Sequence, residues 1–443
     1  MVLTLIKSGA DVNAAEADGT TPLHWAVHRD DTGTARLLLQ SGARVAAVNR
    51  YGVAPLALAC INGSARMAEL LIGAGANPNT EVAEGETALM TAARSGALPL
   101  VKTLVARGAG VNTREDWRGQ SALMWAAAEG HRPVVEALVE AGADLNARSH
   151  GGFTPLLFAA REGRVDVART LLDRGANVND ALQPSSRKPT AEPTAADPQG
   201  VTALILAAGN AHYDLATLLL ERGADPNAAP KGWTALHQMS WVRKAGIAGS
   251  NNPAPEGSGE MDSLEFVRRL VKHGANVNAR VTKRPPAGIT RLNMIGGTPF
   301  LLAARTADAE LMRVLADLGA DPLAPNAERT TPLMVAAGIG TAAPGEDPGT
   351  EPEVLEAVHV ALELGADINA VDANGDTAMH GAASKHLPSV VQFLAESGAK
   401  VEVWNQQNKE GFTPLRIAEG VHRGMNILSS PVTAVAIRKI LEP

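Results

Sequence analysis

Gly-Gln-Ser-Ala-Leu-Met-Trp-Ala-Ala-Ala-Glu-Gly-His-Arg-Pro-Val-Val-Glu-Ala-Leu-Val-Glu-Ala-Gly-Ala-Asp-Leu-Asn, residues 119–146, is the stretch that decides the fold. Variants of it recur almost from end to end of the 443-residue chain. A Gly-Ala pair before a polar turn repeats every 33 residues at Gly9, Gly42, Gly75 and Gly108, and further copies follow. A second marker, Thr-Pro-Leu or a variant of it, opens each of eleven units. A fixed period of this length predicts a repeat architecture.

Each residue that recurs at the same position of the units has a local physical reason. Thr154 can cap a first helix by accepting a backbone N–H bond, and Pro155 follows where its missing N–H costs nothing. The small side chains of Ala159 and Ala160 let stacked helices approach closely. Gly163 and Gly175 are placed to end the first and second helices in the left-handed conformation. No single unit can bury its apolar face alone, so neighbouring units must stack into one continuous core.

The start tetrapeptides, such as Thr21-Pro22-Leu23-His24 and Thr234-Ala235-Leu236-His237, resemble those of the ankyrin repeat. The resemblance implies an all-α ankyrin-repeat solenoid of about eleven helix-turn-helix repeats, with short hairpin turns between them. It also implies that His24, His237 and His380 link neighbouring turns by hydrogen bonds. The Ala-, Gly- and Pro-rich repeats with long insertions look like bacterial ankyrin-repeat proteins of unassigned role.

The domain organisation expected is one continuous solenoid, on the order of 100 Å long at roughly 10 Å per repeat. Residues 1–181 read as regular repeats, of which 1–13 match only the second half of a unit. A Pro-rich loop follows at 182–198. Residues 199–443 read as repeats with insertions at 245–262, 280–295 and 338–352. Such loops cost little stability but are often functional, and both interpretations stay open.

Two sites depart from the repeat pattern in their first helix. Met239-Ser240 stands where Ala-Ala is usual, and Gly381 stands in a slot that is usually Leu. Both put tight stacking in doubt. The last helix, 432–441, is expected to turn Val435 and Ile437 inward and Thr433 outward.

Composition and charge exclude several classes of function. The formal net charge is −7 and no basic run occurs, so nucleic acid is not expected as a partner. The one cysteine, Cys60, excludes an intrachain disulfide and is expected to be a small buried core residue. No apolar run reaches the roughly 18 residues that would cross a membrane, and no secretory signal is present. The compartment stays unknown: export after processing and a cytoplasmic location both remain open.

No motif for chemistry emerges from the sequence. Gly338-Ile339-Gly340 lacks the Gly-Lys-Ser/Thr of a phosphate loop. Neither a nucleophile elbow, nor a zinc-protease His-Glu-x-x-His, nor a dinucleotide fingerprint is found. We therefore expect no catalytic residues, no cofactor and no metal, and a protein that is not an enzyme.

The expected function is a non-enzymatic scaffold for protein–protein interaction. In ankyrin families the variable contacts lie on the hairpin tips and on the exposed side of the first helix. Transferred by position, this implies partner-binding residues that are mostly Arg and Trp, the types enriched at binding hot spots: Arg29, Arg94, Phe153, Arg161, Trp233, Trp241 and Arg305. Trp25, Trp125 and Phe158 fill a slot that is usually Leu, so they are expected to pack rather than to contact a ligand.

The alternative function is a self-assembling structural protein, in which the partner is another copy of the chain. The half-repeat at 1–13 offers the apolar residues Val2, Leu3, Leu5 and Ile6 without a first helix before them. A head-to-tail contact between unlike ends does not close by symmetry and can yield filaments.

Overall fold

A computed structural model describes residues 2–83, 85–183, 200–244, 254–283, 290–342, 344–345, 347–423 and 426–442. The chain divides into two compact units: unit 1, Met1–Glu192, and unit 2, Pro193–Pro443. In both units the described residues form stacked pairs of short antiparallel helices, so the all-α repeat fold is confirmed. The prediction of one continuous solenoid through both units stays a prediction.

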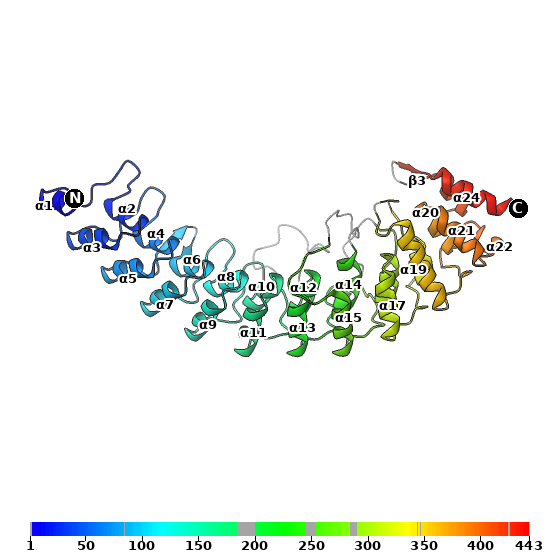
Figure 1. Cartoon of the computed structure of the whole chain (residues 1–443), viewed down its shortest axis with the longest axis horizontal. Coiled ribbons are helices and arrows are strands. Elements are labelled where there is room, and N and C mark those ends of the chain that lie inside the picture. Colours follow the sequence, from blue (N-terminus) through cyan, green and yellow to red (C-terminus); the bar gives the residue numbers. More distant parts are fainter. Residues whose placement is uncertain are drawn as a thin grey trace. The chain divides into compact units, whose positions relative to one another are not determined.

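Unit 1 contains five helix pairs that follow one short helix, α1 (Val2–Lys7). Figure 1 shows the first and second helices in two separate rows. Each first helix packs on the next first helix, and each second helix on the next second helix. The pairs are α2 (Pro22–His28) with α3 (Thr32–Gln40), α4 (Pro55–Ile61) with α5 (Ala65–Gly73), α6 (Ala88–Arg94) with α7 (Leu98–Ala106), α8 (Ala122–Glu129) with α9 (Arg132–Glu140), and α10 (Pro155–Arg161) with α11 (Val165–Asp173).

Unit 2 repeats this arrangement, with longer segments between some helices. Its pairs are α12 (Ala203–Gly209) with α13 (Tyr213–Glu221), α14 (Ala235–Arg243) with α15 (Ser263–Lys272), α16 (Pro299–Arg305) with α17 (Ala309–Asp317), α18 (Pro332–Ala336) with α19 (Glu351–Glu363), α20 (Ala378–Lys385) with α21 (Pro388–Glu396), and α23 (Pro414–Glu419) with α24 (Pro431–Leu441). A four-residue helix, α22 (Val401–Trp404), lies between α21 and α23, and it buries Trp404.

Two small antiparallel hairpins accompany the helices. In unit 1, β1 (Glu81–Ala83) pairs with β2 (Glu86–Thr87) in the turn before α6. In unit 2, β3 (Val421–Arg423) pairs with β4 (Asn426–Leu428), with Val421 opposite Leu428, between the two helices of the last pair. The strands are too short to form a layer of their own.

The helix boundaries follow from the residues that the repeat places there. Thr154 Oγ1 accepts the backbone N–H of Leu157, and Ser121 Oγ accepts that of Met124, each at 3.4 Å. These bonds satisfy N–H groups that the first turn leaves without partners. Gly130 and Gly142 end the two helices of their pair with φ of 88° and 87°, in the left-handed region. Ala126 and Ala127 are fully buried where first helices meet.

The insertions lie partly outside the described residues. The Pro-rich loop at 182–198 falls outside them apart from its first two residues, and so do 245–253 and 284–289. The described part of the 245–262 insertion reaches the first turn of α13: Glu260 N donates to Asp214 Oδ2 at 2.8 Å. The described parts of the other two insertions cover the first helices of unit 2, as shown below.

The two departures from the pattern do not loosen the stacking. Met239 and Ser240 are buried to 0% and 1% exposure, five and six residues after the capping Thr, at the same positions where Ala159 and Ala160 are buried. Gly381 is also buried, and the backbone of the preceding repeat occupies the space of its missing side chain. The doubt raised by these residues was therefore wrong.

Candidate protein-binding face

Unit 1 carries a row of arginine and aromatic side chains on its first helices, in which the buried Phe158 lies beneath more exposed groups. These side chains come from the repeats of α2, α6, α8 and α10, four, seven or eight residues after the capping Thr or Ser, or, for Phe153, from the turn just before it. We call this set the arginine–aromatic row, and it comprises Trp25, Arg29, Arg94, Trp125, Phe153, Phe158 and Arg161. Four of the residues predicted to bind a partner, Arg29, Arg94, Phe153 and Arg161, therefore come together on one side of unit 1.

Each arginine of the row lies over an aromatic ring. The Arg29 Cζ is 5.9 Å from the centre of the Trp25 ring. The Arg94 Cζ is 5.2 Å from that of Trp125, which belongs to the next repeat. The Arg161 Cζ is 5.1 Å from both the Phe153 and the Phe158 ring centres. Such contacts are worth about 0.5–1 kcal/mol each at exposed sites, and they hold the guanidinium groups in place over apolar surface.

Carboxylates fix two of these arginines from the side. Arg94 Nη2 lies 3.1 Å from Glu86 Oε1, and Arg161 Nε donates to Glu162 Oε1 at 2.7 Å. The side chains nevertheless keep 44% and 41% of their surface exposed. Surface ion pairs of this kind contribute little stability, but they restrict the rotamers of groups that a partner would meet.

The expected packing of the three aromatic residues holds only in part. Phe158 is buried to 3% exposure and stacks against Phe153 with ring centres 5.1 Å apart. Trp125 is half-buried. Trp25, in contrast, keeps 42% of its surface exposed while its Nε1 donates to Glu16 Oε1 at 2.9 Å. Trp25 is therefore packed less completely than the usual Leu slot implied.

Two exposed aromatic residues at the hairpin tips were not selected from the sequence. Tyr51 is 64% exposed and Trp117 is 53% exposed. Each stacks with the arginine beside it: Arg50 Cζ lies 4.8 Å from the Tyr51 ring centre and Arg118 Cζ lies 4.1 Å from that of Trp117. The sequence could have identified them by their position at the hairpin tips, because the tips are contact regions in this kind of repeat.

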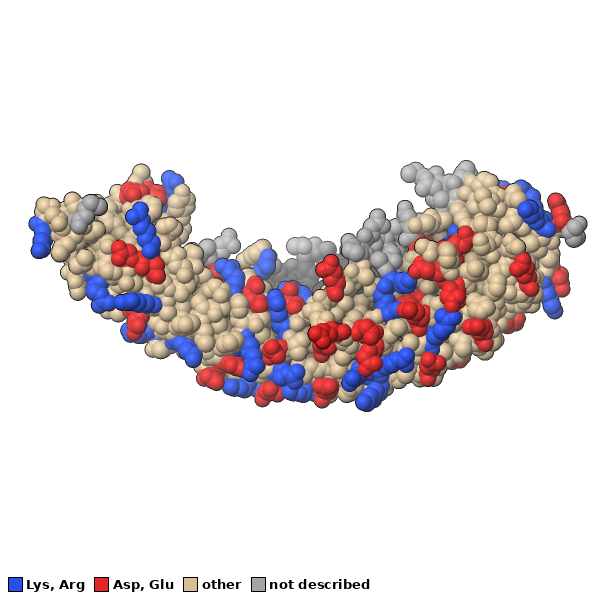
Figure 2. Space-filling view, in the orientation of Figure 1, with Lys and Arg blue, Asp and Glu red and all other residues tan. Residues whose placement is uncertain are grey.

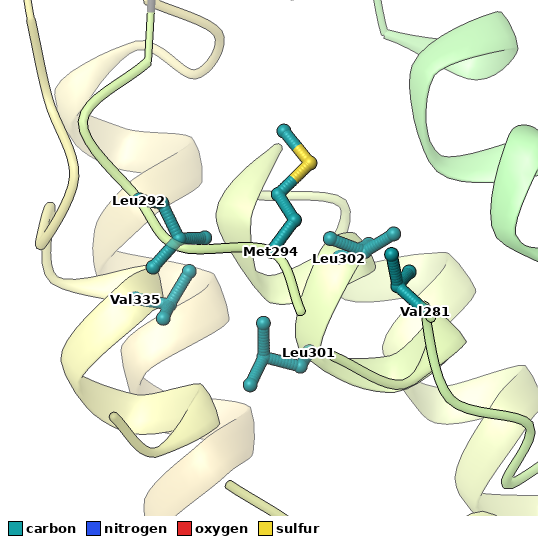
Figure 3. Packing of buried hydrophobic residues seen from close by; sticks show 6 residues of the cluster. All are labelled: Val281, Leu292, Met294, Leu301, Leu302 and Val335. Atoms are coloured by element: carbon teal, nitrogen blue, oxygen red, sulfur yellow. The ribbon is translucent and has the colours of Figure 1, made fainter. Parts of the chain in front are cut away.

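The corresponding side of unit 2 is covered by the chain itself. Val281, Leu292 and Met294 come from the segment between α15 and α16, and they are buried against Leu301, Leu302 and Val335. Figure 3 shows Leu292 beside Val335, with Met294 on the same segment and Leu301 and Leu302 on the neighbouring helix. Trp233 and Trp241 pack on this cluster, with their ring centres 6.0 Å apart. Both are half-buried, because part of each side chain is covered by this cluster. The partner contact predicted for them stays a prediction.

Arg305 does not lie on an exposed face, contrary to its predicted place. It is only 6% exposed, because residues 347–349 of the third insertion lie over it. Its nearest acidic partner is Asp347, with Nη2 and Oδ1 3.7 Å apart. Lys385, also 6% exposed, donates to the Pro348 carbonyl. Burial lowers the pKa of Arg305, and it lowers that of Lys385 to about 8. At this burial, Arg305 does not offer its guanidinium group to a partner.

The residues predicted for self-assembly lie on α1, and much of their side-chain surface stays exposed. Leu3 and Leu5 are 45% and 52% exposed, while Val2 and Ile6 are half-buried. A cavity of about 370 Å³ adjoins this helix, and its walls include Val2, Trp25 and Leu38.

His24 and Cys60, two residues with reactive side chains, have structural surroundings. His24 accepts the Thr21 backbone N–H at Nδ1 and contacts the Val53 carbonyl at Nε2, at 3.1 and 3.0 Å. Burial raises the pKa of the Cys60 thiol to about 12, which keeps it protonated. Among the residues that the structure describes, no group of three or more His, Cys, Asp or Glu side chains could hold a metal ion.

The charged surface is mixed in sign. Figure 2 shows Lys and Arg intermixed with Asp and Glu along the second helices of each unit. In the described part of the chain, no helix combines the length and the apolar character that crossing a bilayer requires.

Stacked helix pairs with a shared core and tips on one side define an α-helical repeat protein of the solenoid class. Family models of ankyrin repeats match residues 1–82 and 89–181 (three copies), 351–395 (many copies) and 199–230 (a single repeat). Together these matches cover more than half of the chain, and the chain belongs to the ankyrin-repeat family. Ankyrin repeats generally mediate protein–protein interaction and are typically non-enzymatic modules.

Proposed function

We propose that this protein is a non-enzymatic scaffold that binds a protein partner through the arginine–aromatic row of unit 1. The observation that carries the proposal is the stacking of Arg29, Arg94 and Arg161 on aromatic rings at the ends of first helices in three repeats. Aromatic residues and arginine are the types that dominate binding energy at protein interfaces.

The geometry supports binding by side chains that are already held in place before the partner arrives. The guanidinium groups are already oriented by rings and by Glu86 and Glu162, so little side-chain entropy is lost on binding. The tips add Tyr51 and Trp117, whose large exposed rings can extend the same contact. We propose no catalytic role for any of these groups.

The test is a double variant, Phe153→Ala with Arg161→Ala, in the full chain. Partners are first captured by the wild-type protein with cross-linking, and their affinity for each variant is then measured by surface plasmon resonance. We expect binding to weaken on the order of tenfold or more, because hot-spot side chains are removed. Arg174→Ala is the matched control, since Arg174 is equally exposed but pairs with Glu140 on the second helices.

Retained affinity in the double variant, with wild-type affinity in the control, would show that the partner binds elsewhere. Circular dichroism of both variants separates a loss of contact from a loss of fold. Phe153 is half-buried, so Arg161→Ala alone serves as a second variant if the double one unfolds.

A second candidate function is self-assembly through the ends of the described chain. Exposed apolar side chains favour it: Leu3 and Leu5 on α1, and Val432 and Val435 on α24, are 45%, 52%, 67% and 46% exposed. Sedimentation velocity over a wide concentration range tests it. Growth of large species that is abolished by Leu3→Glu with Leu5→Glu supports assembly, and a single small species at every concentration excludes it.

A further inference from the structure

One segment of unit 2 lies on a surface that corresponds to the proposed binding face of unit 1. Residues 290–294 are not helical. Leu292 and Met294 are 3% and 5% exposed, while Arg291 between Thr290 and Leu292 points to solvent and Asn293 is half-buried. Burial at every second residue is the pattern of an extended segment with one apolar side.

The segment crosses the first helices of two repeats. Near the end of α18, Arg291 N donates to the Gly340 carbonyl at 3.0 Å, and Thr290 Oγ1 donates to the same oxygen at 3.2 Å. Just after its other end, the backbone pairs with Val281: Gly296 N donates to the Val281 carbonyl at 2.8 Å, and Val281 N donates to the Gly297 carbonyl at 2.9 Å. Between these points Leu292 and Met294 pack against Leu302 of α16 and Val335 of α18 (Figure 3).

The side chains beneath the segment hold the same repeat positions as the arginine–aromatic row. Leu302 and Val335 are the fourth residues after Thr298 and Thr331, as Trp125 and Phe158 are after Ser121 and Thr154. Trp233 and Trp241 likewise correspond to Phe153 and Arg161, one before and seven after the capping Thr. In unit 1 these positions lie under exposed arginines instead of under a loop.

We propose that the first-helix face of unit 1 binds an extended, non-helical segment of its partner, with apolar side chains at every second residue. The inference rests on the proposed function and specifies the ligand of that same face. The chain supplies the template, because its own residues 290–294 occupy the corresponding positions of unit 2. In unit 1 the arginines, held over aromatic rings, present a surface on which such side chains pack, much as Leu292 and Met294 do on Leu302 and Val335.

The experiment uses the full chain and a fluorescent peptide with the sequence of residues 290–297, Thr-Arg-Leu-Asn-Met-Ile-Gly-Gly. Binding is followed by fluorescence anisotropy. We expect saturable binding that is lost when serine replaces both the Leu and the Met of the peptide. We also expect Phe153→Ala with Arg161→Ala to weaken binding at least about fivefold, and Arg174→Ala to leave it unchanged.

Three outcomes would overturn the inference. The serine peptide could bind as well as the original, which would exclude recognition by alternate apolar residues. Binding could depend on Trp233→Ala and not on the unit 1 variant, which would mean that the peptide replaces its own copy in unit 2. The peptide could fail to bind while the captured partner still requires Phe153 and Arg161. In that last case the proposed function stands without this ligand, whereas a partner that ignores both residues refutes the proposed function itself.

Discussion

At the scale of single residues, the histidines show how one side chain joins two repeats. In His237 and His380, as in His24, Nδ1 accepts the backbone N–H of the capping Thr, and Nε2 faces a carbonyl of the following turn. This arrangement needs a neutral ring with its proton on Nε2. The link between neighbouring turns that the family resemblance implied is confirmed. It also makes the histidines sensitive to acid.

Mild acid should therefore destabilise unit 2. Burial lowers the pKa of His237 and His380 to about 4, below the ordinary value of 6.5. Their stabilising contribution is complete above pH 6.5 and is lost as the pH falls toward 4, because the unfolded chain takes up protons first. At pH 5 the unfolding free energy should drop by about 2 kcal/mol for each histidine. Urea denaturation at pH 7, 6 and 5 measures it.

The variant His380→Gln is the control for this pH dependence. It should be less stable at pH 7 but should lose less stability between pH 7 and pH 5. Glu353, whose pKa is lowered to about 2 mainly by Lys244, acts only below pH 4.5 and does not disturb this window. An urea midpoint that is flat from pH 7 to pH 5 would contradict the assignment.

The asparagine that closes each Gly-Ala turn has a role that its sequence position did not show. Read locally, it is only turn chemistry. In the structure Asn112 Nδ2 donates to the Gly142 carbonyl at 3.0 Å, and its Oδ1 accepts the Asp144 N–H at 2.8 Å. Asn227 makes the same pair of bonds to Gly274 and Asn276. The partner lies one repeat away, so only the stacking brings it within reach.

At the scale of the element, Gly381 in α20 is a point of close backbone approach. A Cβ atom there would lie 2.8 Å from Ile339 N and 3.0 Å from the Met334 carbonyl oxygen. The usual Leu of this slot is therefore excluded by the neighbouring repeat. The sequence showed the exception but could not show its cause, because the obstructing atoms come from another helix pair.

The change Gly381→Ala should lower the unfolding free energy by about 1–3 kcal/mol, because backbone atoms must move to admit the methyl group. Gly73→Ala in α5 is the matched control. That glycine has nothing within 4 Å of its Cβ position and is also helical. Here alanine should stabilise by about 0.5–1 kcal/mol. Thermal denaturation followed by circular dichroism compares them, and equal shifts in both variants would refute the steric argument.

The last helix corrects a prediction of which side faces inward. Thr433 is fully buried and Val435 is 46% exposed, the reverse of what was expected, while Ile437 is buried as predicted. The Ser430 cap starts α24 at Pro431, and Ser430 Oγ lies 2.8 Å from Thr433 Oγ1. This bond satisfies the hydroxyl group, so Thr433 can be buried together with Ala434 and Ile437.

The segment 290–294 behaves as part of the core of unit 2. Leu292→Ala should reduce stability by about 2–4 kcal/mol, as expected for a buried leucine. Ile295→Ala, three residues on, is the control: Ile295 is 39% exposed, and its loss should cost less than about 1 kcal/mol. Urea midpoints of the two variants measure the difference. Similar small effects of both variants would support the other interpretation, that the segment is an insertion without a structural role.

At the scale of the whole molecule, the two units share the same repeat but differ in what covers their first helices. In unit 2 the described insertions bury first-helix positions, including Arg305 and the cluster around Leu302. In unit 1 the described residues leave the arginine–aromatic row accessible. We therefore place the proposed partner contact on unit 1.

The sequence period extends through both units and predicts one continuous solenoid. Small-angle scattering of the full chain should then give a maximum dimension on the order of 100 Å or more, from roughly 10 Å for each of about eleven repeats. A much shorter distance, or a distribution with two separate maxima that vary with salt, would indicate units that do not stack on one another.

The sequence by itself determined the repeat, its helix pairs and its caps, because these depend on interactions within about ten residues. It also determined that arginines at matching positions, such as Arg94 and Arg161, lie on one side. Only the tertiary structure decided which of these residues are exposed. The burial of Arg305 under 347–349, the partial burial of Trp241 against the cluster that contains Met294, and the burial of Gly381 against Ile339 depend on atoms from segments far away in the sequence. The period of the repeat carries no information about such contacts.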